Sequence, residues 1–237
     1  MQRQNARGLT AREMGVRLPD VLGLELAQII EWMIIRLEFT PAQHLTEQQI
    51  CALFEVSRSP VREAFRQLES IGLVVRQTRK GIRVTPMTHE HVDEIYFVRT
   101  PLESIAAQCA AKNASKSDIA FLEKSIAALD RALKRDDSDA FFDANMAYFE
   151  RVHSITGNGT LENILRTIEK QAMRYRYFAH KFSKEMQENS AAHLRLIVES
   201  IRKGDSDEAY KRTETMMQEA HKLIVDILRQ HSQFTKM

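Results

Sequence analysis

Apolar residues recur with a period of about 3.6 through most of this 237-residue chain, and this pattern limits its fold more than any other feature. Glycine and proline, which interrupt helices, number only 8 and 5. One stretch differs: LVVRQTRKGIRVTP, residues 73–86, places two β-branched runs on either side of a glycine-containing turn. This arrangement predicts a two-stranded ribbon. We therefore expect a mostly α-helical protein with a single β-hairpin.

Three helices are expected ahead of this ribbon. The first covers residues 22–37. The second begins at Thr46, where the sequence TEQQ predicts a capping box with Gln49. The third begins within residues 57–60 and ends before Gly72, a residue that suits the position after a helix.

Basic residues are concentrated on the third helix and the ribbon. The whole chain has a net charge of only +2, but residues 58–83 contain seven basic and two acidic side chains, a net +5. The apolar stripe of the third helix leaves Arg58, Arg62 and Arg66 on another face. Three helices followed by a basic wing are typical of a winged helix-turn-helix, which places its third helix in the DNA major groove.

The residue types suit contact with double-stranded DNA. Arginine at the start of a recognition helix can form paired hydrogen bonds with guanine, and serine hydroxyls can bind phosphates. At the tip of the wing, Arg79 and Lys80 precede Gly81, whose missing side chain permits close approach to the duplex. Ser57 and Ser59 are equally consistent with helix caps, so their role stays open.

Downstream of residues 84–91 every pattern is helical. Six helices are expected, at residues 92–112 with a break near Thr100–Pro101, and at 116–135, 139–155, 161–182, 184–202 and 206–230. Short connections between them favour an antiparallel all-α bundle. We expect a flexible tail over residues 1–20, a DNA-binding domain over 21–86 and a helical domain over 87–237.

The segment LTEQQICALFEVSRSPVREAFRQLESIGLVVRQTRKGIRV, residues 45–84, closely resembles the DNA-binding domain of the GntR family of bacterial transcription regulators. The resemblance implies that the recognition helix starts at Arg58 and that Gly81 lies at the wing. Gln48 stands where the family commonly carries a DNA-contacting arginine; it can hydrogen bond but adds no charge. The expected DNA-binding residues are Gln48, Ser57, Arg58, Ser59, Pro60, Arg62, Arg66, Arg79, Lys80 and Gly81.

Three later segments resemble the helical ligand-sensing domain of the FadR-like (FCD) subgroup: IYFVRTPLESIAAQCAAKNA, SITGNGTL and LIVESIRKGDSDEAY. Arg99, Glu103 and Asn158 stand at recurring positions of that domain. The resemblance implies a bundle of six or seven helices that forms a homodimer, encloses a small-molecule effector and changes DNA affinity when occupied.

Many members of the subgroup bind a divalent metal through one aspartate and three histidines. The matched positions in this chain carry Asn145, Phe149, Leu194 and Met216. Only the asparagine offers an oxygen, so no metal and no other cofactor is expected. The substitutions predict a more apolar effector pocket, with Arg99 available to bind a carboxylate.

Two alternatives concern other residues of the helical domain. A non-standard metal site could use His153, His193 or His221, although each is more simply read as a hydrogen-bonded or exposed side chain. The segment KQAMRYRYFAHKF, residues 170–182, is interpreted mainly as bundle core, with pocket lining by Arg174 or Tyr177 as the alternative.

The leading hypothesis is a ligand-responsive transcriptional repressor that binds a short inverted repeat as a dimer. A constitutive DNA-architectural protein is one alternative. A metabolic enzyme with an added DNA-binding domain is another, but the sequence lacks a recognisable nucleophile, acid–base pair or metal site, so we expect no enzyme. No stretch approaches the roughly 18 to 20 apolar residues of a membrane span, and no signal peptide is evident, which predicts a cytoplasmic protein with no membrane partner.

Overall fold

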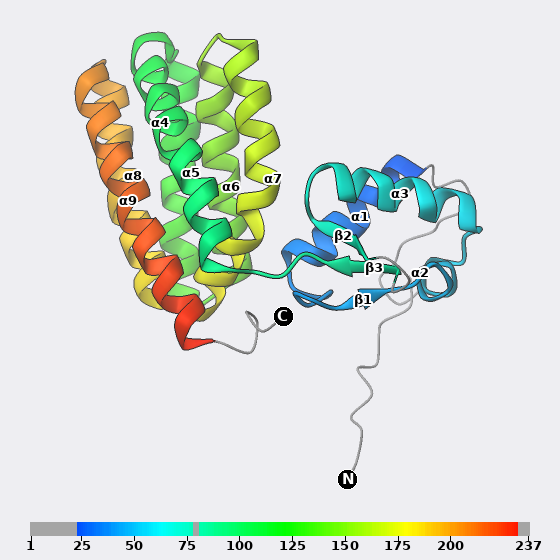
Figure 1. Cartoon of the computed structure of the whole chain (residues 1–237). Coiled ribbons are helices and arrows are strands. Elements are labelled where there is room, and N and C mark those ends of the chain that lie inside the picture. Colours follow the sequence, from blue (N-terminus) through cyan, green and yellow to red (C-terminus); the bar gives the residue numbers. More distant parts are fainter. Residues whose placement is uncertain (1–22, 78–80, 232–237) are drawn as a thin grey trace. The chain divides into compact units, whose positions relative to one another are not determined.

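The computed structural model describes residues 23–77 and 81–231 (Figure 1). These residues form two compact units, the first ending at Pro86 and the second beginning at Met87. Within the described residues the first unit contains three helices and a small sheet, and the second contains helices alone. The prediction of a mostly helical protein with an N-terminal winged helix-turn-helix is confirmed.

The first unit follows the order expected from the sequence, with one additional strand. Its elements are α1 (Gly23–Ile35), β1 (His44–Leu45), α2 (Glu47–Phe54), α3 (Arg58–Ser70), β2 (Val74–Gln77) and β3 (Gly81–Val84). Thr46 caps α2, and its capping box with Gln49 is present as predicted. Glu55 ends α2 in the left-handed conformation with φ of 55°, so the chain turns sharply into α3.

The sheet is antiparallel and has three strands in the order β1-β3-β2. The prediction of a two-stranded ribbon was incomplete, because β1 adds a third strand. His44 and Leu45 of β1 pair with Arg83 and Ile82 of β3. Two residues are too few for a recognisable alternation of polar and apolar side chains, so sequence reasoning missed β1. Arg83 also donates from Nε to the carbonyl oxygen of Ala42 at 2.8 Å, which holds the segment before β1 against β3.

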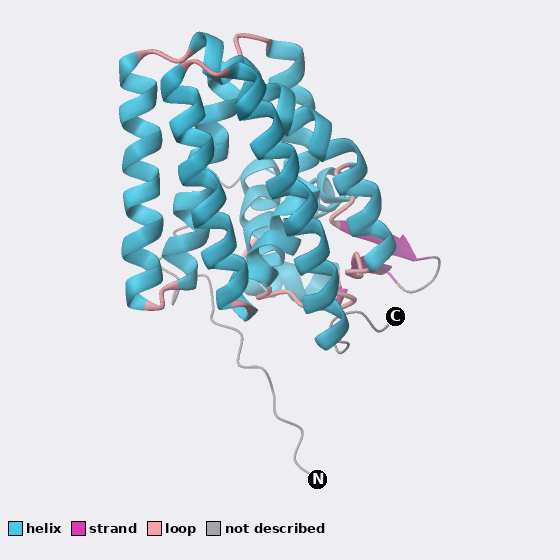
Figure 2. Ribbon diagram, turned by 90° about the vertical axis from the view of Figure 1, so that its left-hand side faces the viewer, coloured by secondary structure: helices cyan, strands magenta, loops and turns pink. Residues whose placement is uncertain are grey.

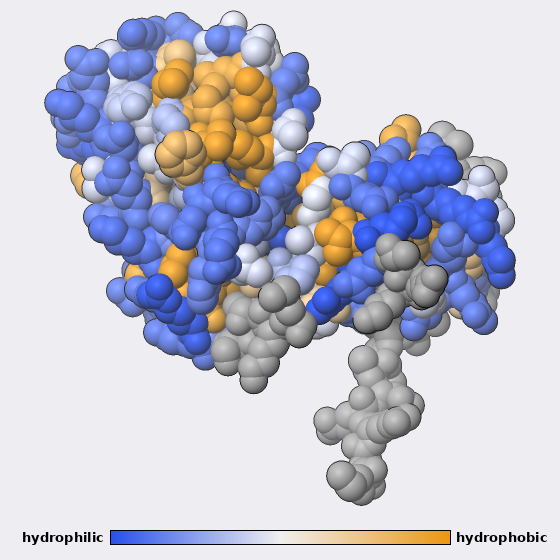
Figure 3. Space-filling view, in the orientation of Figure 1, coloured by the Kyte–Doolittle hydropathy of each residue, from blue (hydrophilic) through white to orange (hydrophobic). Residues whose placement is uncertain are grey.

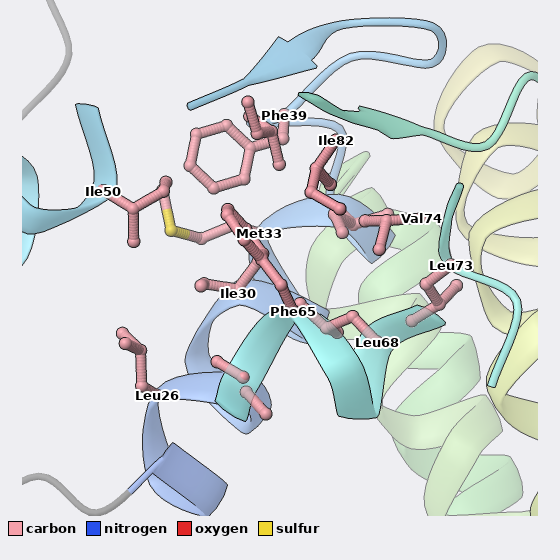
Figure 4. Close-up of a cluster of buried hydrophobic side chains, with 14 of the residues drawn as sticks. Leu26, Ile30, Met33, Phe39, Ile50, Phe65, Leu68, Leu73, Val74 and Ile82 are labelled. Atoms are coloured by element: carbon pink, nitrogen blue, oxygen red, sulfur yellow. The ribbon is translucent and has the colours of Figure 1, made fainter. Parts of the chain in front are cut away.

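Apolar side chains from all three helices and the sheet form the core of the first unit (Figure 4). Leu26 and Ile30 of α1 and Ile82 of β3 are almost completely buried in it. The predicted apolar stripe of α3 is also there, and its members are Val61, Ala64, Phe65 and Leu68. Because this stripe anchors α3, the arginines on its other face are turned outward.

The second unit is a bundle of antiparallel helices with short connections (Figure 2). Its helices are α4 (His89–Asn113), α5 (Lys116–Arg135), α6 (Ser138–Ile155), α7 (Gly159–Phe182), α8 (Lys184–Lys203) and α9 (Ser206–Gln230). α4 packs along α9, and α5 packs against both α6 and α8. The side chains that cap the helix starts after each connection are Ser115, Asp137, Asn158, Ser183 and Asp205.

The break expected near Thr100–Pro101 does not occur. α4 runs without interruption from His89 to Asn113 with Pro101 inside it. Proline removes one helical hydrogen bond, the one to the carbonyl four residues earlier. Pro101 is exposed, and the residue four positions before it, Phe97, is also exposed, so water can reach this carbonyl. Packing of the opposite face of α4 then keeps the helix continuous.

Candidate DNA-binding face and effector cavity

Arg58, Arg62 and Arg66 lie one turn apart on the exposed face of α3. Their spacing of four residues places them along one side of the helix. The opposite side of α3 is the buried apolar stripe described above. α3 therefore presents a row of guanidinium groups at the surface, as the recognition helix of a winged helix-turn-helix must.

The three arginines differ in how they are held. Arg62 places Nε 2.9 Å from Oε1 of Glu47, the first residue of α2. The hydrogen bond from Arg62 lowers the pKa of the Glu47 carboxyl group below its ordinary value. Arg58 and Arg66 form no ion pair within the described residues. Of the three guanidinium groups, only that of Arg62 is held by an ion pair within the described residues.

Four other residues predicted to contact DNA and described by the structure lie at or near the surface of the same unit. Gln48, Ser57 and Ser59 are exposed, and Pro60 in the first turn of α3 is half-buried. Ser57 occupies the N-cap of α3, but its hydroxyl forms no capping hydrogen bond and is free to bind a phosphate.

At the wing, Gly81 is exposed and has a φ of 83°, a left-handed conformation that favours glycine. Arg79 and Lys80 lie outside the described residues.

In the second unit, a small cavity lies among α4, α6, α7, α8 and α9. Its volume is about 20 Å³, enough for a single water molecule. Four of the five residues predicted to bind the effector line it, namely Arg99, Asn145, Phe149 and Met216. Leu194 is fully buried in α8 but is not part of the lining. The other lining residues are Tyr96, Arg176, His180, Met186, Ser190, Met217 and Ala220.

A buried ionic network forms one wall of this cavity. Arg99 Nη2 lies 3.0 Å from Oε1 of Glu103 and 3.1 Å from Oε2 of Glu169. The other oxygen of Glu103 lies 2.8 Å from Nε2 of His153. Arg176 binds Glu169 through Nη1. Two buried guanidinium groups are thus matched by two buried carboxylates.

Asn145 and Phe149 both contact the guanidinium group of Arg176. Arg176 donates from Nη2 to the side-chain oxygen of Asn145. Its guanidinium carbon lies 4.4 Å from the centre of the Phe149 ring, and that of Arg99 lies 5.2 Å from it. Both arginines therefore stack on the electron-rich face of one aromatic ring.

Burial and the two arginines shift the pKa values of the cavity groups. Burial would raise the pKa of Glu103, but the charges of His153 and Arg99 outweigh it and lower the pKa to about 2. Burial and the nearby arginines lower the pKa of His180 to about 3. Burial and the charge of Arg99 lower the pKa of Arg176 to about 9. At neutral pH Glu103 and Arg176 are therefore charged, and His180 is uncharged.

Sequence reasoning missed Arg176 and His180, the two lining residues contributed by α7. Both fall in the segment 170–182, for which lining by Arg174 or Tyr177 was the alternative. Instead, Arg174 Nη2 lies 3.2 Å from Nδ1 of His91, and Tyr177 donates to Asp139. The spacing of Glu169, Arg176 and His180, seven and then four residues, places them on one helix face and could have identified them.

The part of the chain that the structure describes contains no cluster of three or more metal-binding side chains. The three histidines considered for such a site each pair with a separate carboxylate: His153 with Glu103, His193 with Glu219 and His221 with Asp93. Asn158 caps α7 by accepting from the backbone N–H groups of Thr160 and Leu161.

The sequence matches two known families. Residues 22–84 match the bacterial regulatory proteins of the gntR family, and residues 94–219 match the FCD domain. The chain is 32% identical over 151 residues to the uncharacterized HTH-type transcriptional regulator YdhC of Bacillus subtilis, which covers 63% of this chain and 67% of that protein. It is 26% identical to the HTH-type transcriptional repressor RspR of Escherichia coli, covering 88% and 91% of the two chains.

The fold is also similar to that of E. coli McbR/YncC, with a TM-score of 0.76 at 18% identity over 90% of this chain and 99% of that one. No helix in the described ranges has the length and apolarity needed to cross a membrane. The related proteins are DNA-binding regulators of transcription and not enzymes. This chain therefore belongs to the GntR family of bacterial transcriptional regulators, as a member that carries an FCD domain.

Proposed function

We propose that this regulator is a homodimeric repressor that binds a short inverted-repeat operator and responds to a carboxylate metabolite. The exposed row of Arg58, Arg62 and Arg66 supports DNA reading by α3. One such helix covers only a half-site, so an inverted repeat requires two subunits. The relative RspR is named a repressor, which supports the same direction of regulation here.

An apolar surface on the second unit supports the dimer. Phe97 of α4 is 82% exposed, the highest value among the exposed large apolar side chains of the described residues. Ile105, two turns further along α4, and Ile164 on the neighbouring α7 are exposed as well. Figure 3 shows an apolar area over the region between the α4 and α7 labels of Figure 1. A contiguous exposed apolar area of this kind is typical of an interface with a second copy.

The cavity in the second unit is the main observation in support of an effector site. Arg99 and Arg176 line the cavity with guanidinium groups, which bind carboxylates through paired hydrogen bonds, so an effector carboxylate would share or replace their contacts with Glu103 and Glu169. The Nδ1 atom of His180 is buried without a hydrogen-bond partner in the described residues. An unpaired buried nitrogen is costly, and a bound ligand would satisfy it.

The cavity must widen to accept a metabolite. Ligand pockets commonly have volumes of roughly 300 to 1,000 Å³, far above the present cavity. Met186, Met216 and Met217 contribute three flexible thioether side chains to the wall. Methionine changes rotamer easily, so this wall can rearrange around a ligand.

A thermal-shift screen of small carboxylates tests the effector site. A ligand that binds only the folded protein raises its melting temperature. Each compound that does so is then titrated against Ser190→Ala and Ser125→Ala. Both serines are 6% exposed, but only Ser190 lines the cavity, where its hydroxyl lies 3.3 Å from Nε2 of His180.

We expect Ser190→Ala to weaken binding of the compound and Ser125→Ala to leave it unchanged. Equal binding by both variants would place the ligand elsewhere. If no compound changes DNA affinity, the constitutive DNA-architectural function is favoured instead.

A further inference from the structure

The ion pair between Glu47 and Arg62 joins the two helices of the helix-turn-helix motif. Arg62 uses only its Nε atom in this contact, at 2.9 Å from the carboxylate. Its two terminal nitrogens form no hydrogen bond or ion pair within the described residues. The side chain of Arg62 is 57% exposed, so these nitrogens remain accessible.

The pair contributes little to folding stability. In an exposed ion pair water screens the charges, and ordering the two side chains costs entropy. The pair does restrict the arginine, whose free side chain has high rotamer entropy. When part of that entropy is lost before DNA arrives, less is lost on binding, and the arginine is presented in one orientation.

The carboxylate also has an unfavourable effect on DNA binding. Glu47 carries a negative charge among the basic groups Arg58, Arg62 and Arg76, which lower the pKa of its carboxyl group. This charge repels DNA phosphates whatever the base sequence, so it reduces affinity for every duplex. A residue that reduces general affinity while orienting one base-reading side chain raises the ratio of specific to non-specific binding.

We propose that Glu47 is a specificity-determining residue of this regulator. It holds the Nε atom of Arg62 so that the two terminal nitrogens face a single base pair, whereas Arg58 and Arg66 are held by no ion pair within the described residues. The proposal rests on the base-reading role proposed for Arg62.

The test uses the full chain and a duplex that the parent protein selects from a random library. Fluorescence anisotropy at fixed salt measures binding to this duplex, to its single-base-pair variants and to an unrelated duplex. The variants are Glu47→Ala, Arg62→Ala, the double variant and Glu69→Ala. Glu69 is the matched control, because its carboxylate pairs with Arg76 at 3.4 Å in the same unit.

Arg62→Ala first identifies the base pair that Arg62 reads, as the position where discrimination falls by about tenfold. At that position we expect Glu47→Ala to lose much of the same discrimination, and the double variant to lose no more than Arg62→Ala alone. Glu47→Ala and Glu69→Ala should both bind the unrelated duplex several-fold more tightly, since each removes one negative charge. Glu69→Ala should keep the discrimination of the parent.

Two results would overturn the inference, and they differ in meaning. If Glu47→Ala keeps the discrimination that Arg62→Ala loses, the ion pair has no part in specificity although Arg62 reads a base. If Arg62→Ala loses no discrimination at any position, the base-reading role of Arg62 is itself wrong. Circular dichroism of each variant checks that helix content is unchanged.

Discussion

The imidazole of His180 is 1% exposed and lies beside two guanidinium groups. Burial and these positive charges lower its pKa to about 3 from an ordinary value of 6.5. Unfolding therefore takes up a proton between these two pH values. The stability that depends on neutral His180 is fully present above about pH 6.5 and is lost as the pH falls toward 3.

We expect His180→Gln to reduce the slope with which the free energy of unfolding rises with pH below about pH 6.5. One unit of pKa difference corresponds to about 1.4 kcal/mol, so the change in slope is measurable. Urea unfolding followed by far-UV circular dichroism between pH 8 and pH 4.5 gives the free energy of unfolding of parent and variant. Parallel curves for parent and His180→Gln would show that His180 takes up no proton on unfolding.

Single pocket residues were predictable where the sequence resembles the FCD subgroup, because the resemblance identifies the positions that face its ligand site. Arg99, Asn145, Phe149 and Met216 were assigned to one pocket from the sequence, and the structure brings them to one cavity. The spacing of Glu169 and Arg176 places both on one face of α7, but the role of Arg176 was not predicted, because its other partner, Asn145, lies on α6. Such a network depends on how the helices pack, which periodicity does not specify.

At the scale of elements, the start of α2 can be tested through its cap. Thr46 accepts a hydrogen bond from the backbone N–H of Gln49, and the side-chain oxygen of Gln49 accepts from the backbone N–H of Thr46. Thr46→Ala removes the first of these bonds and should lower the free energy of unfolding of the first unit by about 1 kcal/mol. Thr46→Ser keeps the hydroxyl and should cost much less.

The fluorescence of Trp32, the single tryptophan of the chain, reports unfolding of the first unit, where it lies on α1. Equal stability of Thr46→Ala and the parent in a urea titration would contradict the assigned role of the cap.

Most elements were predictable because start and stop residues agree with the helical period. α5 and α9 have the predicted bounds, Lys116–Arg135 and Ser206–Gln230. The two failures have physical causes. β1 is stabilised by pairing with a strand almost forty residues later in the chain, and α4 passes through Pro101 because its buried face continues on both sides.

At the scale of the whole molecule, dimer formation can be tested at the exposed α4 surface. Phe97→Asp places a charge where we propose that a second copy packs, and burying an unpaired charge is strongly unfavourable. We expect the variant to sediment as a monomer at micromolar concentration and to lose affinity for an inverted repeat. Leu196→Asp, at a side chain on α8 that is 45% exposed, should remain a dimer. A dimeric Phe97→Asp variant would move the interface elsewhere.

The absence of a metal from the helical unit is a second prediction at this scale. Asn145 and Phe149 contact Arg176, a cation that belongs to the chain itself. A divalent ion beside this guanidinium group would be repelled, and few ligating atoms are left to hold it. We expect elemental analysis of unchelated protein to find no stoichiometric zinc, nickel or manganese, and a chelator to leave the melting temperature unchanged. About one metal ion per chain would show that the matched positions are misassigned.

The small volume of the cavity has a consequence for how sensitive the regulator is to its effector. If the closed form predominates without ligand, only a minor population is open and able to bind. The effector concentration needed for half-occupancy then equals the intrinsic dissociation constant divided by that open fraction. Any substitution that loosens the closed form, even far from the cavity, therefore lowers the concentration at which the regulator responds. The stability of the ionic network among Arg99, Glu169 and Arg176 therefore helps to set the effector concentration at which the regulator responds. A substitution can change this concentration without altering any contact to the effector.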